Sequence, residues 1–388
     1  MVHALPATAD AVVIGAGVVG ASCAYYLAEA GLTVVVVDRV GTAGGTTSAG
    51  EGNILVSDKE IGAELSLALL SRNLWEQLHV AVGNFEFESK GGIVVAASDS
   101  VAKKLAATAV HQSANGVEIE ELSTSRLLDY EPNINPDLVA AIRYSQDAQV
   151  QPMKAAAALL QHPRITVFSG IEVTAITTSA AGSISGLTTN RGSIATEIVV
   201  NAAGTWGGEI AALAGVNLPI HPRRGFLLVT EPLPQKVFHK VYTAEYLDNV
   251  ASDSAGLETS TVVEGTQGGT ILIGASRERV GFDKTVNFSV LSRLAAGAIA
   301  VFPFLKDVML LRTYGGFRPY CPDHLPVIGP DSRVPGLFHA CGHEGAGVGL
   351  APASGLLIAQ SVMGETLSHS LEHFRPERFD AEVSHVSG

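Results

Sequence analysis

Charged side chains are scarce in this sequence. Asp, Glu, Lys and Arg form 16% of its 388 residues, whereas about a quarter is usual in globular proteins. Acids outnumber bases, which gives a formal net charge of −13, and no cluster of Lys and Arg occurs. Nothing in such a chain can neutralise a run of phosphates, which excludes a nucleic-acid-binding protein. The low charge also indicates that a deep ligand site or other subunits cover part of the surface.

Cysteine is scarce as well. Cys23, Cys321 and Cys341 are odd in number and show no short metal-ligand spacing. This pattern argues against a disulfide framework or a metal site and favours a reducing compartment. The chain starts without the basic segment of a signal peptide and meets an acid at Asp10. The uncharged stretch 11–28 contains glycines that indicate a buried unit and not a membrane span. We therefore expect a cytoplasmic protein.

The first forty residues match the order of a dinucleotide-binding βαβ unit. An apolar run at 11–14 leads into Gly-Ala-Gly-Val-Val-Gly at 15–20, and an Ala-rich helical stretch follows. A β-branched run at 33–37 then ends at Asp38. Strand, glycine turn, helix, strand and acid is the order that such a unit needs. The alternative is a glycine turn in an α/β domain that binds no ligand.

Each residue type in this unit has a physical role. Gly15 permits the tight turn, Gly17 lets a pyrophosphate approach the backbone, and Gly20 lets the helix pack close to the strand. The N-terminus of the helix, with its unpaired N–H groups, attracts the phosphates. Asp38 lies where a carboxylate can accept the ribose hydroxyls.

Small residues dominate the segment that follows. Residues 41–53 are almost entirely Gly, Thr, Ser and Ala, with Glu51 and Asn53 near the end. Hydroxyls and backbone N–H groups of such a segment can wrap closely round a ligand. A nicotinamide enzyme would start another βα repeat sooner, so the segment favours FAD. A flexible surface loop is the alternative interpretation.

The rest of the chain predicts two interleaved domains. Apolar periodicity indicates helices near 61–79, 101–116, 152–160 and 291–302, and strands near 85–97, 165–168, 171–176, 197–201, 224–230 and 270–274. We expect an α/β plus α+β fold, in which a Rossmann-type FAD-binding domain is interrupted by an antiparallel-sheet substrate domain. The expected FAD-binding segments are 1–84, 140–215 and 315–388, and the expected substrate segments are 85–139 and 216–314.

A second glycine motif lies near the C-terminus. A strand is expected at 337–341, a glycine-rich turn at 342–349 and a helix at 351–363. The N-terminus of that helix would face something negative. Reduced flavin develops negative charge at its N1–C2=O edge, and a positive helix end there would raise its electron affinity. The alternative is a turn that serves only packing.

Six segments match the motifs of one known family in the same order. They are residues 15–20, 45–48, 199–204, 316–319, 323–329 and 342–345. The sequence thereby resembles the D-amino-acid oxidase family, which includes glycine oxidase, sarcosine oxidases, and the catalytic subunits of dye-linked proline, hydroxyproline and opine dehydrogenases. The resemblance implies an FAD domain, an antiparallel substrate sheet, and oxidation of an amine C–N bond to an imine that is then hydrolysed.

The resemblance also assigns roles to single residues. It implies cofactor contacts by Gly15, Gly17, Val18, Val19, Gly20, Asp38, Arg39, Thr46, Thr47, Ser48, Gly52, Asn53, Val173, Ala203, Gly204, Gly342, Glu344, Gly345, Ala346, Gly347, Val348 and Gly349. Arg318 would pair with the substrate carboxylate through its planar fork, or form a structural ion pair. His343 would shape the pocket floor beside the flavin. Glu51 would orient the substrate amine or cap a turn.

Three positions depart from known members. Covalent-flavin members carry a cysteine in the region where this chain has Gly316, so we expect dissociable FAD. Cys321 replaces a threonine of many relatives, and we interpret it as a residue of the site wall. Glycine oxidase has a second arginine where this chain has Gly345, which argues against simple glycine-type recognition.

Other features point to a partner subunit. The segment 273–283, together with Arg223 and Arg224, resembles the catalytic subunits of multi-subunit dehydrogenases. The leading hypothesis is therefore FAD-dependent oxidation of an amino acid or secondary amine, by hydride transfer from the carbon next to nitrogen to flavin N5. The enzyme would act alone or in a homo- or hetero-oligomer, with oxygen or a partner redox subunit as electron acceptor. The alternatives are a 2-hydroxy-acid dehydrogenase and a non-catalytic flavin-binding subunit.

Overall fold

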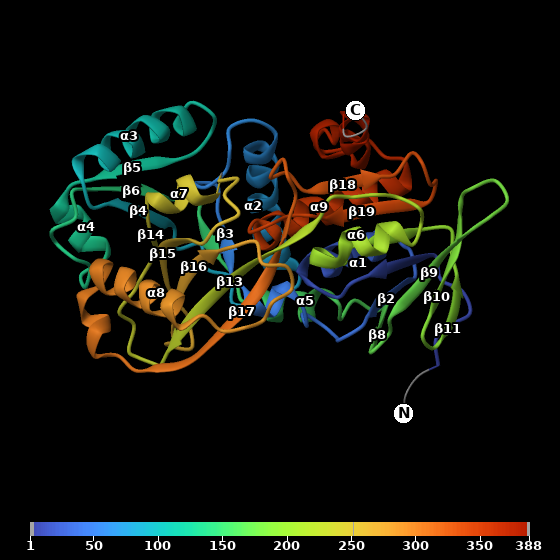
Figure 1. Ribbon diagram of the computed structural model, residues 1–388, viewed down its shortest axis with the longest axis horizontal. Coiled ribbons are helices and arrows are strands. Elements are labelled where there is room, and N and C mark those ends of the chain that lie inside the picture. The colour runs from blue at the N-terminus through green and yellow to red at the C-terminus, as the bar shows by residue number, and fades with distance from the viewer. Residues whose placement is uncertain (1–3, 251, 386–388) are drawn as a thin grey trace.

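Two large sheets lie side by side in the computed structural model, which describes residues 4–250 and 252–385 (Figure 1). The six-stranded sheet has the order β18–β19–β12–β1–β2–β8. Its strands are β1 (Ala11–Ile14), β2 (Val34–Asp38), β8 (Ile165–Ser169), β12 (Val199–Asn201), β18 (Val327–Pro330) and β19 (Leu337–Cys341). All neighbours pair in parallel except β18 and β19. This arrangement confirms the predicted Rossmann-type unit.

Alternate residues of β1 serve opposite faces of this sheet. Val13 packs among residues of α1 (Val18–Glu29) and α9 (Gly347–Met363), whereas Val12 packs with the three-stranded sheet on the other face. That smaller sheet consists of β9 (Val173–Thr178), β10 (Ile184–Thr189) and β11 (Gly192–Ala195). Burial on both faces explains why the central strands are continuous apolar runs without polar alternation.

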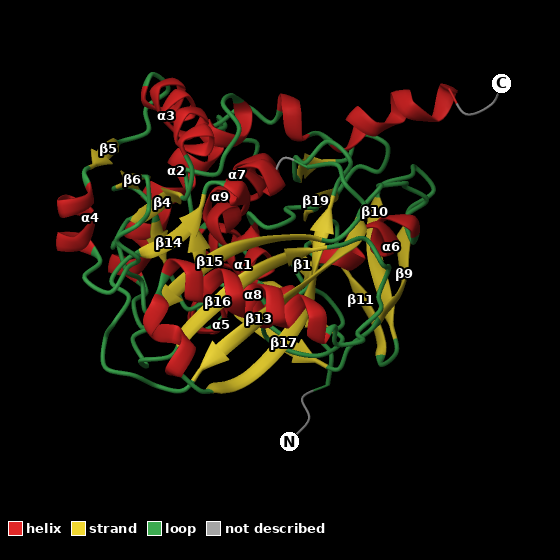
Figure 2. Ribbon diagram, turned by 60° about the vertical axis from the view of Figure 1, so that its left-hand side comes forward, coloured by secondary structure: helices red, strands yellow, loops and turns green. Residues whose placement is uncertain are grey.

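The eight-stranded sheet forms the other half of the molecule. Its order is β17 (Leu310–Tyr320), β13 (His221–Thr230), β16 (Ile271–Arg277), β15 (Glu258–Gly265), β14 (Lys240–Thr243), β4 (Gly92–Ala96), β6 (Ala140–Tyr144) and β5 (Ile119–Leu122). The pairs are antiparallel except β14 with β4. Helix α8 (Phe288–Val301) lies across this sheet in Figure 2 and packs on it through Leu291 and Leu294.

The remaining elements connect or cover the two sheets. They are the helices α2 (Ala63–Ala81), α3 (Asp99–Ser113), α4 (Thr124–Tyr130), α5 (Pro152–Leu159), α6 (Gly207–Ala212) and α7 (Glu245–Val250), and the short strands β3 (Asn53–Ile54) and β7 (Ala148–Gln149). Segments of 3-10 helix lie at Thr46–Ala49, Gly204–Trp206, Pro303–Asp307, Glu372–Phe374 and Pro376–His385. In the figure, α2 and α9 lie between the two sheets (Figure 1).

Sheet membership differs from the expected segments at two places. Strand β6 pairs with β4 and β5 in the eight-stranded sheet, although residue 140 was expected to open an FAD-binding segment. Strand β17 continues to Tyr320 beside β13, past the expected boundary at 315. Hydrophobic patterning detects strands but not the sheet they join, because pairing is decided by contacts far along the chain. The division into segments stays a proposal.

One expected strand begins later than the sequence indicated. Residues 85–87 alternate as a strand would, but the strand in this region, β4, begins at Gly92. Glu86 has a positive φ of 53°, which turns the chain, and Phe85 is buried against Trp75 with ring centroids 5.7 Å apart. The apolar–polar alternation at residues 85–87 therefore belongs to a turn with one buried aromatic side chain and not to a strand.

Helix α9 begins at Gly347, earlier than the expected start at 351. Pro352 lacks the N–H that would bond to Val348, and the indole N–H of Trp75 donates to that carbonyl at 3.0 Å. The Ser71 hydroxyl donates to the Gly349 carbonyl at 2.6 Å and accepts from Ala353 N–H at 3.2 Å. Helix α2 therefore satisfies the two backbone positions that the proline disturbs.

The contact of α1 with α9 depends on Gly355. A Cβ at this position would lie 2.6 Å from the backbone of Ser22. We expect Gly355→Ala to lower the free energy of unfolding by about 1–3 kcal/mol, because two backbones would have to separate. Urea unfolding of the holoprotein measures this change. Gly268→Ala, at an exposed turn with open space around it, is the control, and equal losses in both variants would contradict the argument.

Candidate functional site

An elongated cavity of about 630 Å³ lies at the carboxyl ends of the parallel strands. Its wall includes Ile14 at the end of β1, Asp38 at the end of β2, Ala202 after β12 and Ala340 in β19. In doubly wound folds, ligands bind at this edge of the sheet. The cavity continues past the start of α9 to Arg318 of the neighbouring sheet.

The first glycine motif shapes one part of the cavity. Gly15 has a φ of 112°, and a Cβ there would overlap the carbonyl of Ala202. A Cβ on Gly20 would overlap the Gly15 carbonyl. Helix α1 has no acidic residue in its first turn and no side-chain cap at Gly17. Its positive end therefore stays available to an anionic ligand such as a pyrophosphate.

Asp38 organises the turn beside this helix end. One carboxylate oxygen, Oδ2, accepts from Ala16 N–H at 2.9 Å, and Oδ1 accepts from the N–H groups of Val40 and Gly41 at 2.7 and 2.8 Å. Asp38 lines the cavity, so its remaining acceptor capacity at Oδ2 faces the ligand. The sequence suggested a role in ribose binding, and the structure adds that the same side chain holds the loop in place.

The second helix start lies further along the cavity. Ala346 precedes α9 without any side-chain cap, and Gly347 and Val348 line the cavity. His343, three residues before Ala346, is 3% exposed, and its Nε2 lies 2.8 Å from the hydroxyl of Ser354. Burial lowers the pKa of His343 to about 3. The imidazole is thus a neutral wall residue.

These features fit FAD. Two helix N-termini flank the cavity, and glycines leave space where side chains would project. The start of α9 has no side-chain cap, and at the start of α1 the Thr47 hydroxyl accepts from the Val18 N–H at 3.0 Å. Val173, Asp38 and Arg39 would hold the adenosine end, Thr47 and the start of α1 the pyrophosphate, and the start of α9 the flavin edge.

Most residues expected at the cofactor line this cavity. They are Gly15, Gly17, Val18, Val19, Asp38, Arg39, Thr46, Thr47, Asn53, Val173, Ala203, Gly204, Glu344, Gly345, Gly347 and Val348. The expected catalytic residues Glu51, Arg318 and His343 line it as well. Segments from six distant parts of the chain therefore meet at one site.

Other expected residues lie outside the cavity wall. Ser48 is exposed, and its hydroxyl donates to the Gly45 carbonyl of its own turn at 3.0 Å. Gly20, Gly52 and Gly349 allow backbones to approach, and a Cβ on Gly52, for example, would overlap the Val150 carbonyl. At Gly342 the missing Cβ leaves room for the Cys321 sulfur. Ala346 lines a second cavity instead. For these positions the small residue serves packing, which a motif cannot distinguish from ligand contact.

Cys321 is not a residue of the site wall. Its side chain is fully buried in the core between Val327 and Cys341, directly beneath Gly342. Burial raises the pKa of the Cys321 thiol well above its usual value. The residue therefore supports the turn before α9 from below.

Arg318 projects from β17 into the flavin end of the cavity. Its Nη1 donates to the carbonyl of Ser276 at 2.8 Å, and among the described residues no carboxylate lies within ion-pair distance of it. Burial, reinforced by the nearby positive charge of Arg277, lowers the pKa of Arg318 to about 10. The alternative role, a structural ion pair, is therefore not observed among these residues.

Glu51 lies in a buried polar cluster beside Arg318. Its Oε2 accepts from Asn53 Nδ2 at 3.3 Å, whereas its Oε1 has no hydrogen-bond partner among the described residues. The Lys240 ammonium lies close by and contacts Asn53 and Glu264. Burial raises the pKa of Glu51, and the positive charge of Lys240 opposes that change.

A second cavity of about 650 Å³ adjoins the first. Tyr246, His343, Glu344 and Gly345 belong to the walls of both. Glu344 accepts from Arg223 Nη1 at 2.5 Å and from His324 Nδ1 at 3.0 Å. The hydrogen bond to Glu344 raises the pKa of His324.

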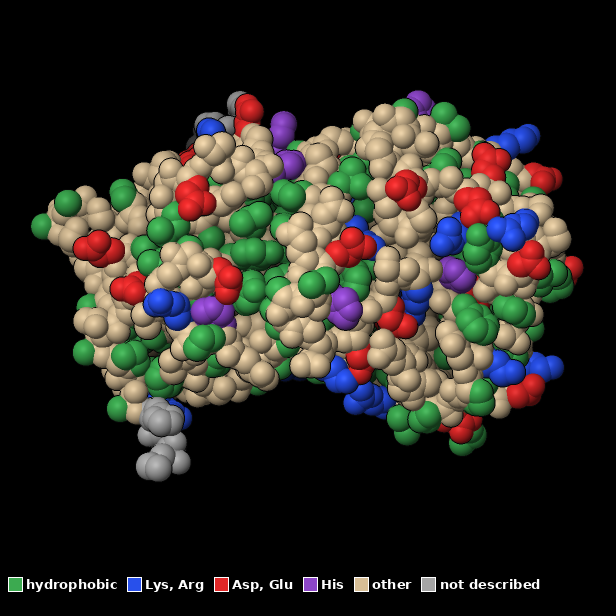
Figure 3. Space-filling model, turned by 180° about the vertical axis from the view of Figure 1, so that it is seen from behind, with side chains coloured by type: hydrophobic (Ala, Val, Ile, Leu, Met, Phe, Trp, Pro, Cys, Tyr) green, Lys and Arg blue, Asp and Glu red, His purple; other side chains and the backbone are tan. Residues whose placement is uncertain are grey.

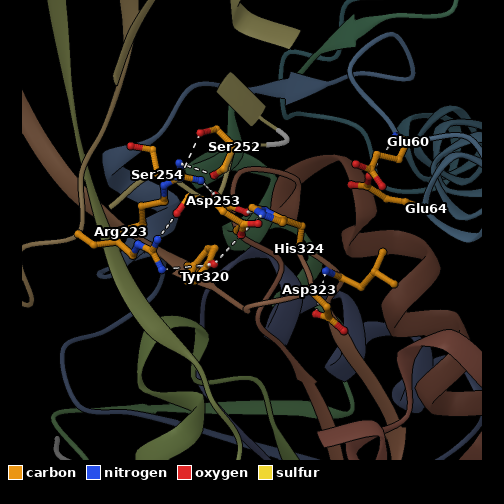
Figure 4. Close-up of polar contacts among 12 residues, drawn as sticks. Glu60, Glu64, Arg223, Ser252, Asp253, Ser254, Tyr320, Asp323 and His324 are labelled. Atoms are coloured by element: carbon orange, nitrogen blue, oxygen red, sulfur yellow. Dashed lines mark hydrogen bonds and ion pairs between the residues drawn. The ribbon is translucent and has the colours of Figure 1, made fainter. Parts of the chain in front are cut away.

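Figure 4 shows that His324 also reaches Asp253, to which Tyr320 donates at 3.3 Å. In the same view, Glu60 and Glu64 lie well apart from this group.

Sequence reasoning missed several wall residues. Trp206 lies between Arg39, whose guanidinium carbon is 4.1 Å from the indole centroid, and Phe282, which stacks on it at 5.4 Å. Tyr246 and Lys284 also line the cavity. Trp206 lies just after the motif at 199–204 but is not part of it, and no motif marks Tyr246 or Lys284.

The surface agrees with the low share of charged residues. Figure 3 shows one face on which acidic and basic side chains are interspersed, and no large area of either sign appears there. Within residues 4–250 and 252–385, no helix combines the length and the apolar character that crossing a bilayer requires.

Comparisons with known proteins agree with this site. Residues 10–361 match the family described as FAD dependent oxidoreductase (DAO). Hydrogen cyanide synthase subunit HcnC of Pseudomonas aeruginosa is 29% identical, with 98% of each chain covered. The solved structure of glycine oxidase from Geobacillus kaustophilus has a TM-score of 0.86 at 25% identity, covering 96% of this chain and 99% of that one. The L-proline dehydrogenase from P. horikoshii gives 0.87 at 25%, covering 97% and 99%.

The neutral state of His343 has a measurable consequence. An unfolded histidine titrates near 6.5, whereas the folded pKa is about 3, so the unfolded chain binds the extra proton between these values. Stability should therefore fall as pH drops below about 6.5. From pH 7.5 to 5.0 we expect the holoprotein to lose about 2 kcal/mol more than His343→Gln, measured by urea unfolding. His373→Gln, an exposed control, should behave as the wild type; equal losses in all three proteins would contradict the assignment.

Proposed function

The chain belongs to the DAO family of FAD-dependent oxidoreductases, and from this premise we propose that its substrate is an amino acid or a carboxylated secondary amine. The observation that supports the proposal is that Arg318 and Glu51 line the same cavity. Within the described part of the chain, a guanidinium without a carboxylate in ion-pair distance lies beside a carboxylate with an unpartnered oxygen. This pair is complementary to the carboxylate and the amine of an amino acid.

Bound FAD would supply the oxidant, accepting at its N5 atom the hydride that leaves the substrate carbon next to nitrogen. The chain must orient that carbon, exclude water and match the substrate's charges. The walls formed by Tyr246, Leu227 and Val348 provide apolar surface near Arg318. Neutral His343 adds no positive charge that would compete for the substrate carboxylate.

Arg318 would bind the substrate carboxylate. Its Nη1 is held by the Ser276 carbonyl, which fixes the plane of the guanidinium while the other N–H groups stay available. A planar fork that is already oriented loses little freedom when it binds a carboxylate in two-point fashion. This positioning would place the reacting carbon at a constant distance from the flavin edge.

Glu51 would bind the amine and take its proton. The raised pKa of Glu51, caused by burial, brings the carboxyl closer to the pH at which it can exchange a proton with a substrate ammonium. Transfer of that proton to Oε1 leaves the nitrogen lone pair free, as loss of a hydride from the adjacent carbon requires. The positive charge of Lys240 would stabilise the Glu51 carboxylate before the proton is transferred.

The test is anaerobic reduction of the purified yellow protein by a panel of amines. Bleaching of the flavin by amino acids or secondary amines, with release of ammonia or amine, supports the proposal. Bleaching by 2-hydroxy acids alone would replace it with hydroxy-acid oxidation. Normal photoreduction without bleaching by any substrate would favour a non-catalytic flavin subunit.

The electron acceptor is part of the same proposal. HcnC is named as a subunit of a larger enzyme, which supports a partner redox subunit as one acceptor of this chain, with oxygen as the other. We place the enzyme in the cytoplasm, where its three unpaired cysteines would stay reduced. Peroxide formation by the isolated chain would identify oxygen as the acceptor.

Removing Arg318 should weaken binding of carboxylated substrates. We expect Arg318→Ala to cost about 2–5 kcal/mol in apparent binding, because a charged hydrogen-bond partner inside the cavity is lost. Rapid anaerobic reduction at varied substrate concentration measures the dissociation constant. Arg312→Ala is the control, since Arg312 is exposed on the same strand. Unchanged affinity in Arg318→Ala would refute the role.

Removing the charge of Glu51 should slow flavin reduction. We expect Glu51→Gln to lower kcat/KM about 100-fold and to remove the corresponding step from its pH profile, because proton transfer is lost. Glu51→Asp should recover part of the rate, since it keeps a titratable group. If Glu51 only caps a turn with Asn53, the Gln variant will lose stability and keep the wild-type pH profile.

A further inference from the structure

Arg277 differs from the other buried cations of the described residues. Each of the others has a carboxylate within ion-pair distance: Lys59 with Asp58, Arg72 with Glu76, Arg223 with Glu344, Arg224 with Glu278 and Lys240 with Glu264. Arg277, at 3% exposure, has no such partner and no side-chain hydrogen bond among these residues. An uncompensated buried charge is costly, so a ligand that neutralises it is expected.

The surroundings of Arg277 hold it in position. It ends strand β16, and its guanidinium carbon lies 4.9 Å from the ring centroid of Tyr246. It lines the second cavity, whereas Arg318 lines the first. Glu344 influences both arginines electrostatically, but its oxygens already accept from Arg223 and His324. Among the described residues, neither guanidinium therefore has a carboxylate within ion-pair distance.

The two cavities meet where a ligand could span them. Gly345 belongs to both walls, and a Cβ there would come no closer than 3.8 Å to the Arg318 side chain. The position at which the sequence lacks a second arginine therefore has room beside Arg318. The guanidinium that lines the adjoining cavity comes from β16 instead.

We propose that the substrate is a dicarboxylic amine, with one carboxylate on Arg318 and the other on Arg277. The amine between them would lie at Glu51, and the inference rests on the function proposed above. Amino dicarboxylic acids and N-carboxyalkyl amino acids have this chemistry. Each buried guanidinium then receives one carboxylate, in the two-point geometry that arginine favours.

The arrangement of acids supports two separate carboxylate sites. Asp58 is neutralised by Lys59 at 2.6 Å, and Glu344 by Arg223. Figure 4 shows Glu60 and Glu64 apart from the group around His324. Among the described residues of this wall, Lys59 and His324 have carboxylate partners, whereas Arg277 has none within ion-pair distance.

The test uses dicarboxylates that cannot be oxidised. Succinate, glutarate and adipate are compared with butyrate, pentanoate and hexanoate of equal chain length, by titration of the flavin absorbance of the holoprotein. We expect at least one dicarboxylate to bind tenfold or more tightly than its matched monocarboxylate. Arg277→Gln should reduce that ratio at least tenfold, and Arg277→Lys should restore part of it.

A control and a second readout separate the outcomes. Arg279→Gln removes a cation two residues along the same segment, where its guanidinium bonds the Asp253 carbonyl and lines neither cavity; its ratio should stay at the wild-type value. A retained flavin spectrum shows that each variant has folded. Equal binding of both acid series by the wild type, or an unchanged ratio in Arg277→Gln, would overturn the inference. Selective dicarboxylate binding without flavin reduction by any amine would instead overturn the proposed function.

Discussion

The close approach of α1 and α9 is the constraint on which the site depends. Gly355 of α9 meets the backbone of Ser22 in α1, and Gly20 of α1 meets the turn at Gly15. Because no Cβ intervenes, both helices can begin at the same edge of the six-stranded sheet. Their N-termini then face one cavity from two directions. The glycines thus act mainly on backbone spacing, and the anion-binding character of the site follows from that spacing.

Buried charges are not paired equally throughout the interior. The unpaired ones lie at the end of the cavity where the substrate would react. Away from the flavin end, buried cations are matched with acids, as in the pair of Arg224 with Glu278. Beside it, and among the described residues, Arg277 and Arg318 have no carboxylate within ion-pair distance and Glu51 keeps an unpartnered oxygen. A substrate with carboxylates for the two arginines and an amine for Glu51 would complete these contacts. Because these charges are unpaired, the fold lacks the stability that ion pairs would have contributed.

Local signals in the sequence were sufficient for the cofactor half of the molecule. The strand, glycine turn and helix at residues 11–29 depend on neighbouring residues, and the structure has them where the pattern indicated. The same holds for the turn before α9. The sheet that β6 and the end of β17 join could not be derived in this way, because their pairing partners lie far along the chain. Cys321 looked like a residue of the site wall because it lies between two motifs, but its side chain is buried in the core.

The substrate half resisted prediction for a more specific reason. In the sequence, Arg277, Glu278 and Arg279 alternate in charge as a solvated strand edge would. The structure separates them: Glu278 pairs with Arg224, Arg279 bonds the Asp253 carbonyl, and Arg277 turns inward. What distinguishes Arg277 is the absence of a partner among the described residues, and a missing contact leaves no pattern in a single sequence. Substrate specificity in this fold is therefore better sought among unpaired buried charges than among motifs.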